Sequence, residues 1–211
     1  MLTHQINPHF LYNTLEAIRW KAESRQASDI SEMVRSLGNL LRLSLNDGRE
    51  LTTVEREIEH VKAYVAIQSA RQDTSIRVVY MIDEDILQLP CMRLMLQPLV
   101  ENAIKHGTRH AGDGEAVKIL IRGSLEPYRL LFEIVDNGPG IPEALRAGLL
   151  TAERNVPHQR KGVGLRNVHE RLALYFGERY GLQIENRDEG GTVIGISHPI
   201  LDTEPAQRDA I

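Results

Sequence analysis

The sequence is poor in the residues and runs that mark several classes of protein. It contains a single cysteine, Cys91, among 211 residues, so it cannot form an internal disulfide. No spacing of cysteine and histidine resembles a zinc site. The near absence of cysteine fits a reducing, cytoplasmic compartment.

Long apolar runs and an excess of positive charge are also missing. No apolar run approaches the roughly 20 residues that a membrane-spanning helix needs, and no signal peptide is visible. The net charge of −4 provides no basic field, so we expect no nucleic-acid partner. What remains is an ordinary globular composition, 42% hydrophobic and 26% charged, over a length that suits one large domain or two small ones.

The first fifty residues predict a helical hairpin. Residues 2–24 carry apolar side chains at helical spacing, and a second such series runs from Ile30 to Leu45 after the polar stretch ESRQASD. Asn7 and Pro8 read either as an N-cap and first helical residue or as a kink in a longer helix.

Two amphipathic helices alone cannot cover both of their apolar stripes. One solution is a homodimer in which two hairpins form a four-helix bundle. The alternative is that the hairpin docks on the rest of its own chain.

The remainder of the chain predicts an α+β sandwich with a mixed sheet and helices stacked on one face. Thr52 to Glu55 form a capping-box pattern that opens a helix. Apolar alternation and turn signals then predict the further elements in this order: a strand at 76–82, a helix from about Pro90 to His106 stopped by Gly107, strands at 117–121 and 129–136, a helix over 164–177, and strands at 182–187 and 192–198. The tail after Pro199 looks disordered.

Three short segments carry side chains or glycines suited to a nucleotide. The first is LQPLVENAIKHG, where Asn102 offers an amide oxygen suited to Mg²⁺ and Lys105 a positive charge suited to phosphate. Taken alone, this segment also fits an amphipathic helix with a polar end.

The second segment, DNGPGI, follows a buried strand. Asp136 can accept a hydrogen bond from an exocyclic amine such as that of adenine, and Gly138 and Gly140 let the backbone approach a flat ring closely. The same letters also fit a plain turn.

The third segment, KGVGLRNV, places Gly162 and Gly164 directly before a helix, where backbone N–H groups and the helix dipole can hold phosphate. It does not match the dinucleotide fingerprint, because no strand leads directly into it and no third glycine follows at the right spacing.

In this order, ENAIKHG, DNGPGI and KGVGL resemble the N, G1 and G2 boxes of the GHKL ATPase superfamily. Together with QINPHFLYNTL, they closely resemble sensor histidine kinases of the LytS/YesM-like class over about residues 2–200. The resemblance implies a GHKL/Bergerat-type sandwich that binds ATP, with Asn102 as the Mg²⁺ ligand. Residues from about 143 to 161 would form a mobile lid over ATP.

By the same resemblance, Asp136 contacts the adenine amine, Gly138 and Gly140 shape the adenine pocket, and Gly162 and Gly164 form the hinge of the lid. The other nucleotide-binding residues that it implies are Lys105, His106, Ile141 and Leu165.

His9 resembles the phosphoacceptor of the family, which takes the γ-phosphoryl group of ATP on an imidazole nitrogen. Its unperturbed pKa of about 6.5 leaves much of it neutral and nucleophilic at cytoplasmic pH. The residue after it is Phe10, not an acid, so the sequence identifies no general base. Asn13, four residues on, is a candidate for orienting water in a phosphatase reaction or simply a surface amide. We discount His106 and His110 as a metal pair because Gly107 is expected to interrupt the helix.

One departure from the GHKL pattern separates transfer from hydrolysis. The ATP-hydrolysing members carry a glutamate four residues before the Mg²⁺ asparagine, and this chain has Pro98 there. Glu101 projects about 100° around the helix from Asn102, so it is not at the hydrolase position, although it is a minor candidate for assisting metal or phosphate.

The sequence is thus expected to contain a dimerising phosphoacceptor hairpin (1–50), an ATP-binding catalytic domain (51–200) and a tail (201–211). The resemblance implies autophosphorylation of His9 and phosphoryl transfer to the aspartate of a response-regulator receiver domain. It also implies the cytoplasmic part of a bacterial membrane protein, anchored only through an upstream segment absent from this chain. The alternatives are a GHKL ATPase whose hairpin only dimerises and a nucleotide-binding module without catalysis.

Overall fold

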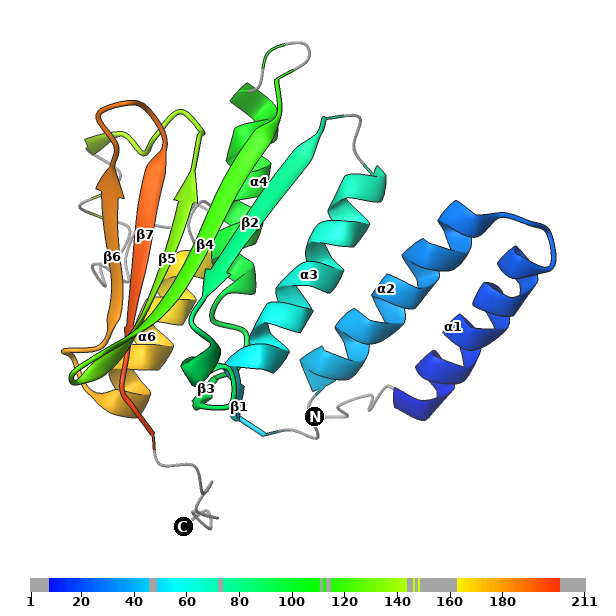
Figure 1. Cartoon of the computed structure of the whole chain (residues 1–211), viewed down its shortest axis with the longest axis horizontal. Coiled ribbons are helices and arrows are strands. Elements are labelled where there is room, and N and C mark those ends of the chain that lie inside the picture. The colour runs from blue at the N-terminus through cyan, green and yellow to red at the C-terminus, as the bar shows by residue number, and fades with distance from the viewer. Residues whose placement is uncertain are drawn as a thin grey trace, which may run out of the picture.

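A helical hairpin and a sheet covered by helices make up the fold (Figure 1). The structure is a computed structural model and describes residues 8–45, 49–71, 74–110, 112, 115–143, 146, 148 and 163–201. The hairpin consists of α1 (Pro8–Glu23) and α2 (Ser28–Leu45), which pack on each other, and α2 also packs on α3 (Val54–Arg71). The predicted hairpin is confirmed. The described part of α1 begins at Pro8, and a proline is tolerated in the first turn of a helix because its φ is already helical and its missing N–H would have no partner there.

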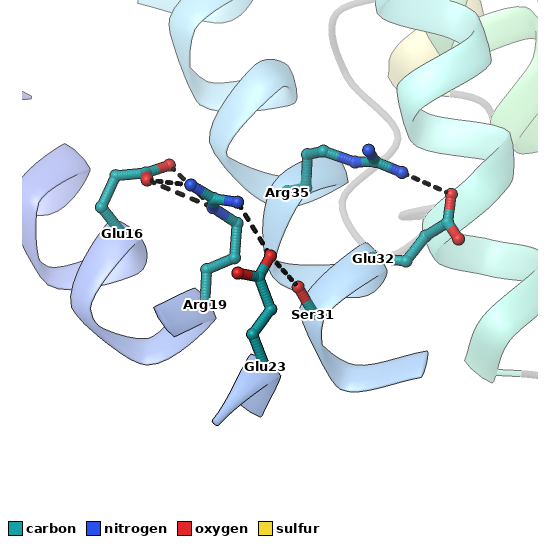
Figure 2. Close-up of polar contacts among 6 residues, drawn as sticks. All are labelled: Glu16, Arg19, Glu23, Ser31, Glu32 and Arg35. Carbon is teal, nitrogen blue, oxygen red and sulfur yellow. Dashed lines mark hydrogen bonds and ion pairs between the residues drawn. The ribbon is translucent and has the colours of Figure 1, made fainter. Parts of the chain in front are cut away.

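Polar contacts join the two helices of the hairpin near their connection. Glu23 of α1 accepts a hydrogen bond from the hydroxyl of Ser31 on α2 at 3.0 Å. Arg19, which lies one turn before Glu23 on α1, forms ion pairs with Glu23 at 2.9 Å and with Glu16 at 2.7 Å (Figure 2). The left-handed backbone of Gln26, with φ of 57°, reverses the chain between the helices.

The second part of the molecule is built on a five-stranded mixed sheet with strand order β2-β4-β5-β7-β6. β2 and β4 are parallel and the other pairs are antiparallel. In Figure 1, α4 and α6 lie on one face of this sheet, as the predicted α+β sandwich requires. The elements are β2 (Ile76–Ile82), a 3-10 turn (Glu84–Ile86), α4 (Gln97–His110), β4 (Val117–Glu126), β5 (Arg129–Asp136), α6 (Val163–Phe176), β6 (Gly181–Asn186) and β7 (Thr192–His198).

The core lies between the sheet and its helices. Along β5, Leu130, Phe132 and Ile134 are fully buried, and the residues between them are partly exposed, as period-two alternation requires. From the helical side, Leu99 of α4 and Leu172 of α6 are equally buried. None of the described helices combines the length and apolar character needed to cross a membrane.

The predicted helix from Pro90 is wrong in its start. Residues Pro90–Met92 form a short strand, β3, that pairs antiparallel with β1 (Leu51–Thr53). Leu94 then adopts a left-handed conformation with φ of 55°, which a right-handed helix cannot include. The helix therefore begins only at Gln97.

The predicted capping box is displaced by one residue. The side chain that caps α3 belongs to Thr53, whose hydroxyl accepts the N–H of Arg56 at 3.3 Å. Thr52 instead lies in β1, where it pairs with Cys91 of β3.

The predicted stop at Gly107 is also wrong, because α4 continues to His110. Gly107 is buried, and a Cβ added to it would lie 2.7 Å from a methyl carbon of Val117 on β4. The glycine allows the helix to pack closely on the sheet and does not end it. The reason given for discounting His106 and His110 as a pair on one helix is therefore removed.

Candidate nucleotide-binding site

The helix α4 presents three polar side chains near its middle. Asn102, Lys105 and His106 are spaced three and four residues apart, so they lie on neighbouring positions of one helical face. Asn102 is partly buried, whereas Lys105 and His106 are exposed. The face offers an amide oxygen and a cation beside each other.

Asp136 ends β5 and is buried, with 7% of its surface exposed. One carboxylate oxygen accepts the N–H of Gly138 at 2.8 Å, and the backbone and hydroxyl of Thr192 donate to the carboxylate as well. Burial raises the pKa of Asp136 above its ordinary value, while these bonds and the charge of His106 oppose the rise. A carboxylate has about four lone-pair positions, so three internal donors leave room for one donor from a ligand.

The loop after Asp136 is held by the end of β6. Asn186 accepts the N–H of Ile141 at 2.8 Å and donates to the carbonyl of the same residue at 2.7 Å. Gly140 has φ of 77°, and a Cβ there would lie 3.2 Å from the Asn186 amide oxygen. Gly140 is therefore needed for the turn itself. The two hydrogen bonds between Ile141 and Asn186 fix the loop.

The third predicted segment meets the other end of α4. Gly164 lies in the first turn of α6, and a Cβ on it would lie 3.5 Å from Cβ of Pro98. Leu165 is buried in the core, which anchors the start of α6. Gly162 and most of the predicted lid (143–161) lie outside the described residues, while Arg166 donates to the carbonyl of Gly148 at 3.2 Å.

The three predicted segments converge on α4. Gly138 approaches the backbone of Gly107 near the end of this helix, since an added Cβ would lie 3.9 Å from the Gly107 nitrogen. Gly164 approaches Pro98 near its start. Asn102 and Lys105 lie between these two contacts. Segments that are 26 or more residues apart in sequence therefore approach the same helix, one near each end.

The predicted phosphoacceptor is not brought to this face. His9 is the second residue of α1, and its side chain lies outside the described part of the structure. Figure 1 shows α2 and α3 between α1 and the sheet. Asn13, one turn after His9, is exposed on α1. Glu101 is exposed, and its charge contributes to raising the pKa of Tyr64 on α3 to about 12, after the larger effect of burial.

The donors around α4 suit a metal ion that arrives with a nucleotide. Within the described residues, no group of three or more histidine, cysteine, aspartate or glutamate side chains gathers to hold a metal. Mg²⁺ commonly takes one or two protein oxygens and completes its shell with water and phosphate oxygens. A single amide oxygen from Asn102 fits that pattern and would not fit a cage made by protein alone.

Three residues that hold the site were missed by the sequence reasoning. Asn186 clamps the loop, Thr192 donates to Asp136, and Asn137 accepts the N–H of Lys118 at 2.7 Å and donates to the carbonyl of Ala116 at 3.1 Å. The only available signal for Asn137 was its place in the DNG turn, and the other two become visible only when β6 and β7 are placed beside β5.

Two family models match the chain. Residues 1–76 match the family model described as histidine kinase. Residues 89–202, more than half of the chain, match the model described as histidine kinase-, DNA gyrase B-, and HSP90-like ATPase.

Curated relatives extend the likeness to nearly the whole chain. It is 38% identical over 198 residues to sensor histidine kinase YesM of Bacillus subtilis, covering 94% of this chain and 32% of that protein. It is 35% identical over 202 residues to sensor histidine kinase BtsS of Escherichia coli K12, covering 96% and 33%. The chain thus spans about a third of the length of these relatives.

Solved structures share the fold. The nucleotide-free catalytic domain of histidine kinase ThkA aligns with a TM-score of 0.52 at 23% identity, covering 71% of this chain and 95% of that domain. The histidine kinase domain of the Erythrobacter litoralis blue-light activated kinase EL346 aligns with a TM-score of 0.50 at 16% identity, covering 92% and 94%. The two family models and the curated relatives together show that the chain belongs to the histidine kinase family, with YesM/LytS-like sensor kinases among its relatives.

Proposed function

We propose that this chain is the transmitter region of a two-component sensor histidine kinase. It binds ATP on α4, transfers the γ-phosphoryl group to His9, and passes that group to an aspartate of a response-regulator receiver domain. The observation that carries the proposal is the convergence of the DNGPGI and KGVGL segments on α4, the helix that holds Asn102 and Lys105.

Each side chain of the site has a definite part in binding. The carboxylate of Asp136 accepts the adenine amine, and the Gly138–Gly140 turn leaves space for the ring. Lys105 and the first turn of α6 face the phosphates, where a cation and the N–H groups at a helix N-terminus favour negative charge. Asn102 would hold Mg²⁺ through its amide oxygen, and the ion would supply positive charge at the transferring group.

The transfer step balances as a displacement at phosphorus. A bond forms between an imidazole nitrogen of His9 and the γ-phosphorus, the bond to the bridging oxygen breaks, and ADP leaves with that electron pair. The imidazole gives up its proton to solvent or to a base that the sequence does not identify. Pro98 at the hydrolase position supports transfer to His9 in preference to attack by water.

Dimerisation is part of the proposal. Phe10 and Trp20 of α1 are 66% and 63% exposed, and Ile18 and Leu37 also show apolar surface. A second hairpin packing on this surface would complete a four-helix bundle. A different side of the hairpin is covered where α2 packs on α3. Dimerisation of the hairpin and its docking on its own chain are therefore compatible.

The proposal is tested by incubating the protein with γ-labelled ATP and Mg²⁺. We expect label on the wild type, and no label on Asn102→Ala in spite of an unchanged circular dichroism spectrum. Release of inorganic phosphate without labelling would indicate an ATPase instead. Absence of both nucleotide binding and label would contradict the proposal.

A further inference from the structure

A buried carboxylate outside the nucleotide site holds the segment that leads into α4. Glu57 lies in the first turn of α3 with 2% of its surface exposed. Its carboxylate accepts three successive backbone N–H groups, from Leu94 at 2.6 Å, Met95 at 3.1 Å and Leu96 at 3.3 Å. These amides end one residue before α4 begins.

The backbone of this segment is adapted to the carboxylate. Leu94 takes a left-handed conformation, which is unfavourable for a residue with a side chain. Alternation of right- and left-handed residues points successive N–H groups to one side and creates a concavity for an anion. Glu57 fills that concavity, so the cost at Leu94 is offset by the bonds that the turn makes possible.

The helix α6 is fastened to the same segment. Arg171 donates to the carbonyl of Arg93 at 2.9 Å and forms a 3.5 Å ion pair with Glu50. Its charge also acts favourably on the Glu57 carboxylate. Residues 93–96 are therefore held from α3 by Glu57 and from α6 by Arg171, and they set where α4 starts relative to both helices.

We propose that Glu57 is a positioning residue for metal-dependent nucleotide binding, acting through the amides of residues 94–96 on the placement of Asn102. Asn102 lies six residues after Leu96 along a continuous helix, so a shift or tilt at the start of α4 is passed directly to it. Asp136 stands on β5, which pairs with β4 and β7 and not with this segment. This inference rests on the proposed function.

The test compares Glu57→Gln with Glu59→Gln, the same chemical change at an exposed position of the same helix. An amide group has one acceptor oxygen where the carboxylate has two, so Glu57→Gln must break part of the three-bond contact. Two affinities are measured for each variant, one for a non-hydrolysable ATP analogue with Mg²⁺ and one for adenosine without metal. Hydrogen exchange at Leu94, Met95 and Leu96 reports the contact independently of binding.

We expect Glu57→Gln to lower the affinity for the Mg²⁺ analogue about tenfold or more, to change adenosine affinity by less than about twofold, and to speed exchange at residues 94–96. Glu59→Gln should match the wild type. Two results would overturn the inference: unchanged Mg²⁺-analogue affinity in a folded Glu57→Gln protein, or an equal loss of both affinities, which indicates a general structural role.

A second variant keeps the inference testable if Glu57→Gln does not fold. Arg171→Gln loosens the same segment from α6 at a partly exposed position, and we expect the same selective loss for the Mg²⁺ analogue with a smaller size. Equal loss of both affinities in this variant would also count against the inference. A wild type that binds adenosine but shows no effect of Mg²⁺ would refute the metal assignment of the proposed function before any variant is compared.

Discussion

At the scale of single residues, the site depends on a buried acid whose surroundings are already arranged. Asp136 receives three hydrogen bonds from its own chain, so its carboxylate does not need to reorganise when a donor from a ligand arrives. Such preorganisation improves affinity because less ordering is required on binding.

Removing the charge of Asp136 should weaken nucleotide binding. Asp136→Asn loses one acceptor oxygen and turns an amide donor toward groups that donate, so we expect ATP affinity to fall by about tenfold to a hundredfold, as for a lost hydrogen bond to a charged group. Isothermal titration calorimetry measures the change. Asp188→Asn, an exposed aspartate in the turn before β7, is the matched control. Equal ATP affinity in the two variants would show that Asp136 does not contribute to nucleotide binding.

Two buried histidines should make stability depend on pH. Burial lowers the pKa of His198 and of His60 to about 4 from 6.5, so each binds a proton more readily when the chain is unfolded. Their contribution to stability is complete above pH 6.5 and is lost as pH falls toward 4, with a slope of at most about 1.4 kcal/mol per pH unit for each histidine.

This pH dependence is measured by urea unfolding at pH 7.5, 6, 5 and 4.5. His198 accepts the N–H of Met92 at 3.1 Å and contacts the carbonyl of Pro199 at 2.7 Å, which fixes it in the neutral form. In His198→Gln, part of the slope between pH 6.5 and 4.5 should disappear. An identical slope in the variant would show that this imidazole does not titrate on unfolding.

At the scale of elements, the hairpin turn between β6 and β7 packs against the backbone of Asp136 and so supports the site. Gly191 has φ of 96°, and a Cβ on it would collide with the carbonyl oxygen of Asp136. Its neighbour Gly190 has a similar φ of 89° but nothing within 4 Å of the same position. Substitutions at these two glycines therefore distinguish the free-energy cost of a left-handed backbone from the added cost of a steric clash.

Alanine substitutions at this pair should differ in size. Gly190→Ala should cost about 1–2 kcal/mol, since it only forces a left-handed alanine. Gly191→Ala should cost clearly more, because the backbone at Asp136 must also move, and it should weaken ATP binding as well. Thermal unfolding and calorimetry give both quantities. Equal costs and equal ATP affinities would contradict the close approach of the turn to β5.

The elements show where sequence patterns succeed and where they fail. Strands such as 129–136 were predictable because the alternation of apolar residues along the sequence matches the alternation of buried residues in the strand. Gly107 and Pro90 were misread because a helix-stop and a helix-start signal are local, whereas the contact of Gly107 with Val117 and the ladder of β3 with β1 are tertiary. The motif residues Asn102, Asp136 and Gly164 were found by resemblance, and the supporting Glu57, Asn186 and Thr192 were not, because their partners are distant in sequence.

At the scale of the whole molecule, α3 connects the hairpin to the nucleotide site. The ring of His60 forms a hydrogen bond with the backbone carbonyl of Leu40 on α2, and Glu57, one turn earlier, holds the entry to α4. Because α2 lies between α1 and α3, the proposed transfer requires either that the hairpin move on α3 or that His9 come from a second copy of the chain.

The proposed dimer should depend on the exposed face of α1. Trp20→Glu places a charge on the apolar surface that a second hairpin would cover, and we expect a dissociation constant raised more than tenfold, equivalent to about 1.4 kcal/mol or more. Leu174→Glu, at an exposed leucine on α6, is the control and should leave the dimer intact. Analytical ultracentrifugation distinguishes them. A monomeric wild type at micromolar concentration would contradict the four-helix bundle.

The central claim is that His9 accepts the γ-phosphoryl group, and it is tested most directly by the chemistry and location of the label. After incubation with γ-labelled ATP and Mg²⁺, the wild type and the control His110→Gln should carry a label that acid removes and alkali leaves in place. His9→Gln should carry none while binding ATP with unchanged affinity. An acid-stable label, or a label that persists in His9→Gln, would contradict the account.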